Sequence, residues 1–391
     1  MNNNGLNAKY AFIQATYYMV FCMVIGYAAV YLGAIGMSST IIGLILAGGN
    51  VLTSIMQPII ASVIDKQHLS LNKVLIIMLI VMIGLSLGVT FLANVPLLAA
   101  IFYVLLAMVL FSLMPLINSL AFAFEEHGVQ LNFGVARGIG SVAYAICSLA
   151  LGEVVKIYSP KLMPFVYIVV LFAMIPVIRS FVLKDVSEKE EEKILEEEIP
   201  ASTGDVSFFK KYTTFMIFLG GFILVYLDHT MINNFFINVV KGVGGNTSDM
   251  GRAVFLAAVL ELPAMSLFQK YKEKLRIDSV LKISAIFFTV KHLLTYLAMN
   301  MAMIYIAQAF QMIAYALFIP ASVFYVDKLV AKQDAIKGQS LVTVSMTISG
   351  VFASLLGGVL MDGIGSHGAL LVGLIISAVG TLIMLFTTER V

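Results

Sequence analysis

Charged side chains are scarce in this 391-residue chain: they make up 12% of it, whereas soluble domains carry roughly 25%. Hydrophobic residues account for 60%, and the formal net charge is +2. This composition excludes a soluble globular protein, and without a concentrated basic region we expect no nucleic acid as a partner. Cysteine is also rare. Cys22 and Cys147 both lie in apolar runs, which excludes a disulfide framework and a cysteine-based metal site.

Motifs typical of enzymes and nucleotide-driven pumps are missing as well. There is no Gly-x-x-x-x-Gly-Lys-[Ser/Thr] loop, so we do not expect ATP to drive this chain. No His-x-x-x-His, His-Glu-x-x-His or paired Asp motif falls in the hydrophobic stretches, which leaves a polytopic membrane enzyme as the least favoured alternative. We therefore expect no enzymatic activity, no metal and no cofactor.

The chain does contain long stretches without charged residues. Between Lys9 and Asp65 lie 55 residues without Asp, Glu, Lys or Arg, and between Lys73 and Glu125 lie 51. A helix needs about 20 residues to cross the hydrocarbon core, so each stretch holds two crossings and a turn. Unpaired backbone groups are excluded from lipid, so the crossings must be helical. The first run begins at Tyr10 and is too long for a signal peptide, so we expect it to remain as a span.

This pattern predicts an all-α membrane protein with twelve transmembrane helices. The predicted spans are about 10–34, 41–64, 73–93, 97–123, 134–157, 163–183, 212–240, 251–269, 279–298, 302–326, 336–361 and 368–388. If both termini are cytoplasmic, 18 of the 24 Lys and Arg residues fall on the cytoplasmic side and 4 on the other, while Arg137 and Lys291 lie within spans. This bias agrees with the positive-inside rule. We expect a multi-pass protein of the plasma (bacterial inner) membrane.

The chain is predicted to consist of two related halves. The longest polar stretch, 184–204, follows the sixth span and is too charged to form a core, so it predicts a cytoplasmic linker. The predicted domains are thus a six-helix bundle at 1–183, a linker at 184–211 and a second bundle at 212–391. Leu69–Leu75 aligns with Leu275–Leu281 at an offset of 206 residues, which favours an internal repeat and a pseudo-two-fold axis between the bundles. Such repeats are typical of alternating-access transporters.

Motifs of the first half resemble the lactose permease group of the major facilitator superfamily. Gln57-Pro58, Asp65-Lys66 and Lys73 follow the group's Gln-Pro…Asp-Lys…Lys pattern, and 133–140 is similar to its Phe-Gly-x-Ala-Arg-x-x-Gly motif. In the second half Asp228, Glu261 and Val290-Lys291 stand where the group carries Asp, Glu and Val-Arg. The resemblance implies the major facilitator fold and proton-coupled transport of a solute.

The polar centre departs from that group at several positions. Asn118 stands where the group has its sugar-binding Glu. Gln308, Gln311 and Ala314 replace its Lys, His and Glu in the tenth helix. The lactose-type proton relay is therefore absent, and a galactoside is not the expected solute. Nucleosides, other sugars and aromatic acids remain open.

Three fixed charges are predicted near the centre of spans in the second half: Asp228, Glu261 and Lys291. A charge at a span centre costs roughly 2.5–3.5 kcal/mol, so each should face the bundle interior. Two carboxylates facing one ammonium leave one negative charge unbalanced, which favours protonation of one carboxylate. We assign these three residues and His292 to proton coupling. A permanent ion pair between Glu261 and Lys291 is the structural alternative, and a hydrogen-bonding role is the alternative for His292.

Other polar and aromatic residues within spans are candidate solute ligands: Asn118, Arg137, Gln308, Gln311 and Tyr315. The Arg137 guanidinium can bind a hydroxyl pair or carboxylate with two hydrogen bonds, or reach the cytoplasmic interface instead. The three amides suit a neutral, hydroxyl-rich solute but are also common in hydrogen bonds between helices. Tyr315 can stack on a ring or simply pack.

Asp65, Lys66 and Lys73, around the predicted loop between the second and third spans, are expected to gate the carrier, or else to form a simple loop salt bridge. Together these features predict a secondary active transporter that imports a small polar solute with protons. A proton-coupled efflux antiporter and a uniporter of the same fold are the alternatives. The expected partners are the solute, protons and the lipid bilayer, without an obligate protein partner.

Overall fold

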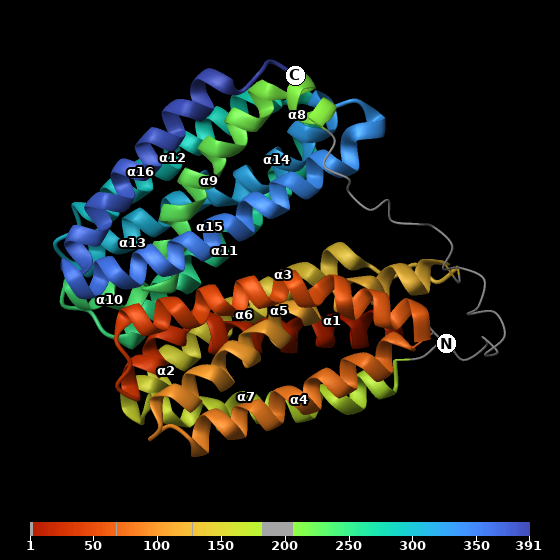
Figure 1. Cartoon of the computed structure of the whole chain (residues 1–391), viewed down its shortest axis with the longest axis vertical. Coiled ribbons are helices and arrows are strands. Elements are labelled where there is room, and N and C mark those ends of the chain that lie inside the picture. Colours follow the sequence, from red (N-terminus) through yellow and green to blue (C-terminus); the bar gives the residue numbers. More distant parts are fainter. Residues whose placement is uncertain (1–2, 68, 127, 182–205) are drawn as a thin grey trace. The chain divides into compact units, whose positions relative to one another are not determined.

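The computed structural model of the chain describes residues 3–67, 69–126, 128–181 and 206–391. These residues are helical throughout, with no strand among them (Figure 1). The first half contains α1 (Asn3–Phe21), α2 (Ala28–Ala34), α3 (Ser39–Gln67), α4 (Leu71–Phe91), α5 (Pro96–Glu126), α6 (Phe133–Ile157) and α7 (Met163–Arg179). The second half contains α8 (Val206–Lys211), α9 (Thr213–Asn234), α10 (Phe236–Gly242), α11 (Thr247–Tyr271), α12 (Ile277–Tyr296), α13 (Met301–Ala309), α14 (Tyr315–Leu329), α15 (Ala335–Gly363) and α16 (Gly365–Thr387). The all-α prediction is confirmed.

Eleven helices in the described ranges are long and apolar enough to cross a membrane. The predicted span at 279–298 corresponds to α12, which is not among the eleven. Its charged and polar side chains, including Lys282, Lys291 and His292, lower the mean hydropathy of a helix that is otherwise of spanning length. A helix of this kind needs protein neighbours for its polar face, and α12 packs against α14 and α16.

Three predicted spans are broken helices. The span at 10–34 contains a π-helical turn at Cys22–Gly26, where a Cβ on Gly26 would lie 2.6 Å from the Tyr144 hydroxyl. The span at 212–240 is divided at Phe235 into α9 and α10. The span at 302–326 contains a 3₁₀ turn at Phe310–Met312, between α13 and α14. Such turns within helices often mark functional positions.

The chain divides into two compact units. Unit 1 comprises Met1–Met37, Gly48–Ser148 and Ile157–Ala201, and unit 2 comprises Ser38–Ala47, Leu149–Lys156 and Ser202–Val391. Most of the predicted linker, 184–211, lies outside the described residues, and its last six residues form α8. The Lys211 Nζ lies 2.8 Å from Asp334 Oδ2, and this hydrogen bond raises the pKa of the Lys211 ammonium.

Buried tyrosines join the helices of unit 1. The Tyr103 hydroxyl donates to the Val24 carbonyl oxygen over 2.6 Å, and the Tyr27 hydroxyl donates to the Ser148 carbonyl oxygen over 2.8 Å. These bonds link α5 to the π-helical turn and the start of α2 to α6. A hydroxyl away from water needs such a partner, because an unpaired one costs free energy comparable to a lost hydrogen bond.

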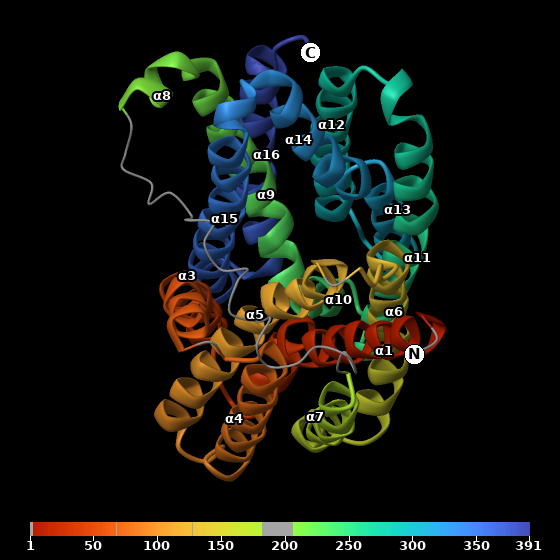
Figure 2. The same ribbon diagram turned by 90° about the vertical axis from the view of Figure 1, so that its right-hand side faces the viewer.

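In unit 2, α9 lies between α15 and α16 (Figure 2). Two glycines allow α9 and α16 to cross at backbone contact distance: a Cβ on Gly221 would lie 2.8 Å from the Gly380 carbonyl oxygen, and a Cβ on Gly380 would lie 2.7 Å from that of Gly221. On the cytoplasmic side predicted for this unit, an aromatic cluster fills the space between α9, α12 and α14. It includes Phe215, Phe218, Phe222, Phe288 and Phe318.

Candidate functional site

The polar centre of unit 2 is built on two pairs of adjacent residues, Asp228 and His229 on α9 and Lys291 and His292 on α12. All four side chains are buried, with exposed fractions of 0%, 3%, 1% and 1%. Burying an unpaired charge costs several kcal/mol, so each ionisable group should have a polar partner. The partners come from three further elements, α11, α16 and the 3₁₀ turn, and they form two separate links.

The first link joins α9, α12 and α16 through the imidazole of His292. The Asp228 Oδ2 lies 2.7 Å from His292 Nδ1, and the Ser377 Oγ lies 3.0 Å from the same nitrogen. The contact with Asp228 is at ion-pair distance, and neither oxygen of its carboxylate forms a hydrogen bond with the described residues. Gly373 makes room for the carboxylate on α16, since a Cβ there would lie 2.0 Å from Asp228 Oδ1. Asp228 is thus paired with His292.

The second link joins α11, α12 and the 3₁₀ turn through Gln311. The Lys291 Nζ donates to Gln311 Oε1, and Gln311 Nε2 donates to Glu261 Oε1 over 2.9 Å. The Gln311 amide thus contacts both charged side chains. The structure therefore brings the predicted coupling residues together, but an amide stands between Lys291 and Glu261.

Aromatic rings enclose His229 beside these links. Its ring centroid lies 5.1 Å from that of Tyr315 and 5.1 Å from that of Phe288. On the other side the Asn233 amide nitrogen lies 3.0 Å from His229 Nε2. Tyr315, predicted as a solute ligand, is therefore next to the polar centre, and Gln308 is buried one helical turn before Gln311.

The solute ligands predicted in unit 1 lie on α5 and α6. The Arg137 guanidinium carbon is 4.2 Å from the ring centroid of Tyr18, a cation–π contact. Asn118 Oδ1 accepts a hydrogen bond of 3.1 Å from Gln14 Nε2, which lies 2.9 Å from the Tyr10 hydroxyl. Gln14 is not among the predicted site residues. Its signal in the sequence is an amide within an otherwise apolar span.

The three predicted gating residues belong to unit 1 and take no part in either link. Asp65, Lys66 and Lys73 are exposed, and none forms an ion pair with a residue in the described parts of the chain. Their role in gating stays a prediction.

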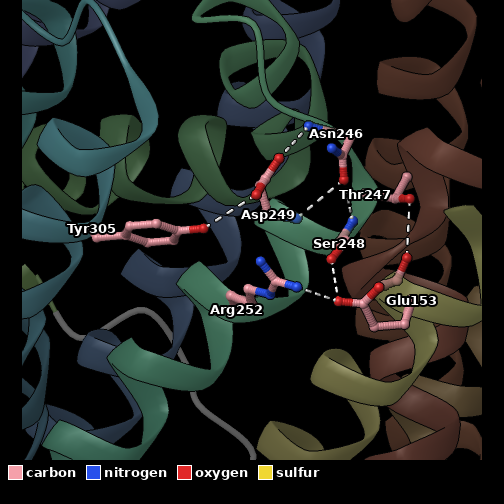
Figure 3. A network of polar contacts seen from close by, with 8 residues as sticks. Glu153, Asn246, Thr247, Ser248, Asp249, Arg252 and Tyr305 are labelled. Atoms are coloured by element: carbon pink, nitrogen blue, oxygen red, sulfur yellow. Dashed lines mark hydrogen bonds and ion pairs between the residues drawn. The ribbon is translucent and has the colours of Figure 1, made fainter.

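A further polar network in unit 2 lies at the start of α11 (Figure 3). The Arg252 guanidinium and the Ser248 hydroxyl both donate to Oε1 of Glu153, the former over 2.7 Å. Asn246 caps the helix, and the Tyr305 hydroxyl donates to Asp249 over 3.4 Å. None of these residues is among those predicted. The sequence signal that could have found part of the network is the capping pattern of Asn246 with Asp249.

A second side chain caps the start of a helix at α3. The carboxylate of Asp362, near the end of α15, accepts hydrogen bonds from the backbone nitrogens of Ser39 (3.0 Å) and Thr40 (2.7 Å). It therefore satisfies two of the amide groups that a helix leaves unpaired at its start. Among the described residues no three His, Cys, Asp or Glu side chains are grouped so that they could hold a metal ion.

Comparison with known proteins decides the family. The family model described as "MFS_1 like family" matches residues 9–372, which is most of the chain. The chain belongs to this MFS_1 like family. The resemblance to the major facilitator superfamily, predicted from the motifs, is confirmed, and so is the predicted fold class.

Solved structures similar to this MFS_1 like protein share its fold at low sequence identity. A mutant of the nucleoside transporter NupG has a TM-score of 0.81 and 12% identity, with 99% of this chain and 100% of that one covered. The D-xylose-proton symporter has a TM-score of 0.71 and 12% identity, with 100% and 97% covered. In sequence, the protein is 22% identical over 218 residues to the "uncharacterized transporter YwbF" of Bacillus subtilis (strain 168). That match covers 56% of this chain and 52% of the relative, about half its length.

Proposed function

We propose that this MFS_1 like protein is a secondary active transporter that imports a small polar solute together with protons by alternating access. Its place is the plasma (bacterial inner) membrane, with both termini in the cytoplasm. The observation that carries the proposal is the buried polar centre of unit 2. There α9, α11 and α12 contribute four ionisable residues: Asp228 lies at ion-pair distance from His292, and Lys291 and Glu261 are both hydrogen-bonded to Gln311.

Burying the charged groups of the polar centre within membrane spans costs free energy. A membrane helix without Asp228 or Lys291 would insert more easily, because each charge at the span centre costs roughly 2.5–3.5 kcal/mol. Replacing a buried ion pair with apolar groups is often neutral or stabilising, so stability alone does not require these residues. Proton coupling does require these residues, because it needs a carboxylate that is protonated in one stage of the transport cycle and ionised in another.

We assign solute binding to Asn118, Arg137, Gln308 and Tyr315. Amide, guanidinium and aromatic groups together suit a solute that offers hydroxyls and a ring. A sugar or a nucleoside has both. The nucleoside and D-xylose transporters with the same fold support this choice of solutes to test.

Proton flux in proteoliposomes tests the proposal. The purified protein is reconstituted with a pH-sensitive dye inside the vesicles, and a panel of sugars, nucleosides and aromatic acids is added outside. Import with protons lowers the internal pH when the correct solute is added. Antiport raises the internal pH, and uniport moves labelled solute without a change in pH; either result would overturn the proposed symport.

Matched carboxyl-to-amide variants locate the coupling groups. We expect Glu261→Gln and Asp228→Asn to lose solute-dependent acidification. Glu273→Gln removes an exposed carboxylate in the loop before α12 and should behave as the wild type. If both buried variants acidify the vesicles at the wild-type rate, these carboxylates do not couple protons to transport.

A further inference from the structure

Gln311 occupies an unusual position between two ionisable groups. Its side chain is 7% exposed and lies in the 3₁₀ turn Phe310–Met312, where it accepts from Lys291 and donates to Glu261. We propose that Gln311 is a positioning residue that makes the protonation of Glu261 depend on the charge of Lys291. This inference rests on the proposed proton coupling and names the group that sets it. It replaces the sequence-based assignment of Gln311 to solute binding.

The orientation of the Gln311 amide follows from its neighbour. An ammonium has three donors and no acceptor, so only the amide oxygen can face Lys291. The amide nitrogen must then face Glu261, and it can only donate. A half-turn of the amide would put two donors against each other at Lys291. As long as Lys291 is charged, the amide is fixed with a donor aimed at the Glu261 carboxyl group.

A fixed donor distinguishes the two states of Glu261. The carboxylate accepts a charge-assisted hydrogen bond, which is roughly twice as strong as a bond between neutral groups. A protonated Glu261 either aims its own O–H at the amide nitrogen, which opposes two donors, or offers its carbonyl oxygen in a weaker, neutral bond. The link therefore favours ionised Glu261, and proton binding weakens the connection between α11 and the 3₁₀ turn.

Other titratable groups also act on this link. On α9 these are Asp228, His229 and Tyr226, on α12 it is His292, and on α14 it is Tyr315. None of them bonds to the Gln311 amide in the described ranges, and all of them remain when Gln311 alone is changed. A shift caused by a Gln311 substitution therefore reports the amide.

Three variants separate positioning from packing. Gln311→Met keeps the length of the side chain and removes both hydrogen bonds. Gln311→Glu keeps the acceptor for Lys291 but sets a second carboxyl group against Glu261, so the two must share a proton. Gln339→Met is the matched control, because Gln339 donates to the exposed Val323 carbonyl oxygen and, among the described residues, to no group of the polar centre.

Infrared difference spectroscopy during a pH titration measures the outcome. The full-length protein in lipid nanodiscs is titrated, and the carboxylic-acid C=O band that disappears in Glu261→Gln is assigned to Glu261. We expect Gln311→Met to move the midpoint of this band upward by about 0.5–1 pH unit, since loss of one charge-assisted bond favours the acid form. Gln311→Glu should move it upward as well, and Gln339→Met should leave it in place.

The titration needs no solute, so its result is independent of whether transport is detected. A midpoint that is unchanged in both Gln311 variants, or that moves downward, overturns the proposed positioning role. If Gln311→Met fails to fold, Gln311→Leu takes its place, because leucine also removes both hydrogen bonds, whereas the second carboxyl group in Gln311→Glu raises the midpoint by repulsion alone. A shifted midpoint in a protein that moves no solute with protons would refute the proposed function and leave this inference standing.

Discussion

Replacing Gly373 with alanine tests the contact that places Asp228 in the polar centre. A Cβ at this position of α16 would lie 2.0 Å from Asp228 Oδ1 and 2.4 Å from Met231 Cε. Methionine can move its end group, but Asp228 is completely buried and paired with His292 at 2.7 Å. The added methyl group therefore has to displace either the carboxylate or the helix backbone.

Overpacking, loss of the buried pair and helix propensity together set the expected change in the free energy of unfolding. Overpacking of a well-packed site costs about 1–3 kcal/mol, and disrupting a buried pair raises this to about 3–5 kcal/mol if His292 no longer reaches the carboxylate. Alanine gains about 1 kcal/mol of helix propensity over glycine. The net effect of Gly373→Ala is a loss of up to about 2 kcal/mol in the free energy of unfolding if the pair with His292 is kept, and of about 2–4 kcal/mol if it is disrupted.

Gly220→Ala is the matched control, and its expected change in stability has the opposite sign. Gly220 lies in α9 with nothing within 4 Å of an added Cβ, so Gly220→Ala should gain up to about 1 kcal/mol. Thermal unfolding followed by far-UV circular dichroism in detergent measures both variants, with Tm expected to fall for Gly373→Ala and to stay level or rise for Gly220→Ala. In an Asp228→Ala background Gly373→Ala should cost less, because the carboxylate it displaces is gone. A Gly373→Ala protein at least as stable as the wild type would refute the close approach of α16 to Asp228.

Three further contacts give predictions that the same melting assay checks. Asp362→Ala removes the acceptor at the start of α3, including the bond from Thr40. Like the loss of a helix cap, it should lower the free energy of unfolding by about 0.5–2 kcal/mol. An unchanged Tm would argue against capping. Arg252→Met should leave the Tm nearly unchanged, because its pair with Glu153 is largely exposed, and a clear fall in Tm would indicate a more buried network. Gln14→Leu leaves buried hydroxyl and amide groups without a partner and should cost about 1–3 kcal/mol, whereas a neutral result would show that water replaces its bonds.

The spanning helices could be predicted from the sequence because the membrane imposes a minimum length of apolar residues. The boundaries follow the charge pattern closely: the span predicted at 134–157 is α6, Phe133–Ile157, and that predicted at 336–361 is α15, Ala335–Gly363. The candidate coupling residues could also be named, because charges within apolar runs are costly and therefore rare.

The pairing of those residues could not be predicted from spacing. Their positions along the spans predict similar depths for Asp228, Glu261 and Lys291, but not which face of each helix they occupy. The structure pairs Asp228 with His292 and separates Lys291 from Glu261 by the Gln311 amide. The 3₁₀ turn that presents Gln311 contains neither proline nor glycine, so no residue type in Phe310–Met312 marks the break.

The two links of the polar centre are connected through α12. Lys291 and His292 are consecutive, so their side chains leave the helix about 100° apart. One therefore faces Gln311, and the other faces Asp228 and Ser377 on α9 and α16. A change in the Glu261 bond loosens α11 from the 3₁₀ turn, while Lys291 still attaches α12 to that turn and His292 still contacts α9 and α16. Proton binding at Glu261 would then act between α11 and the helices joined through α12, and Gln311, which contacts both charged groups, is the residue through which it acts.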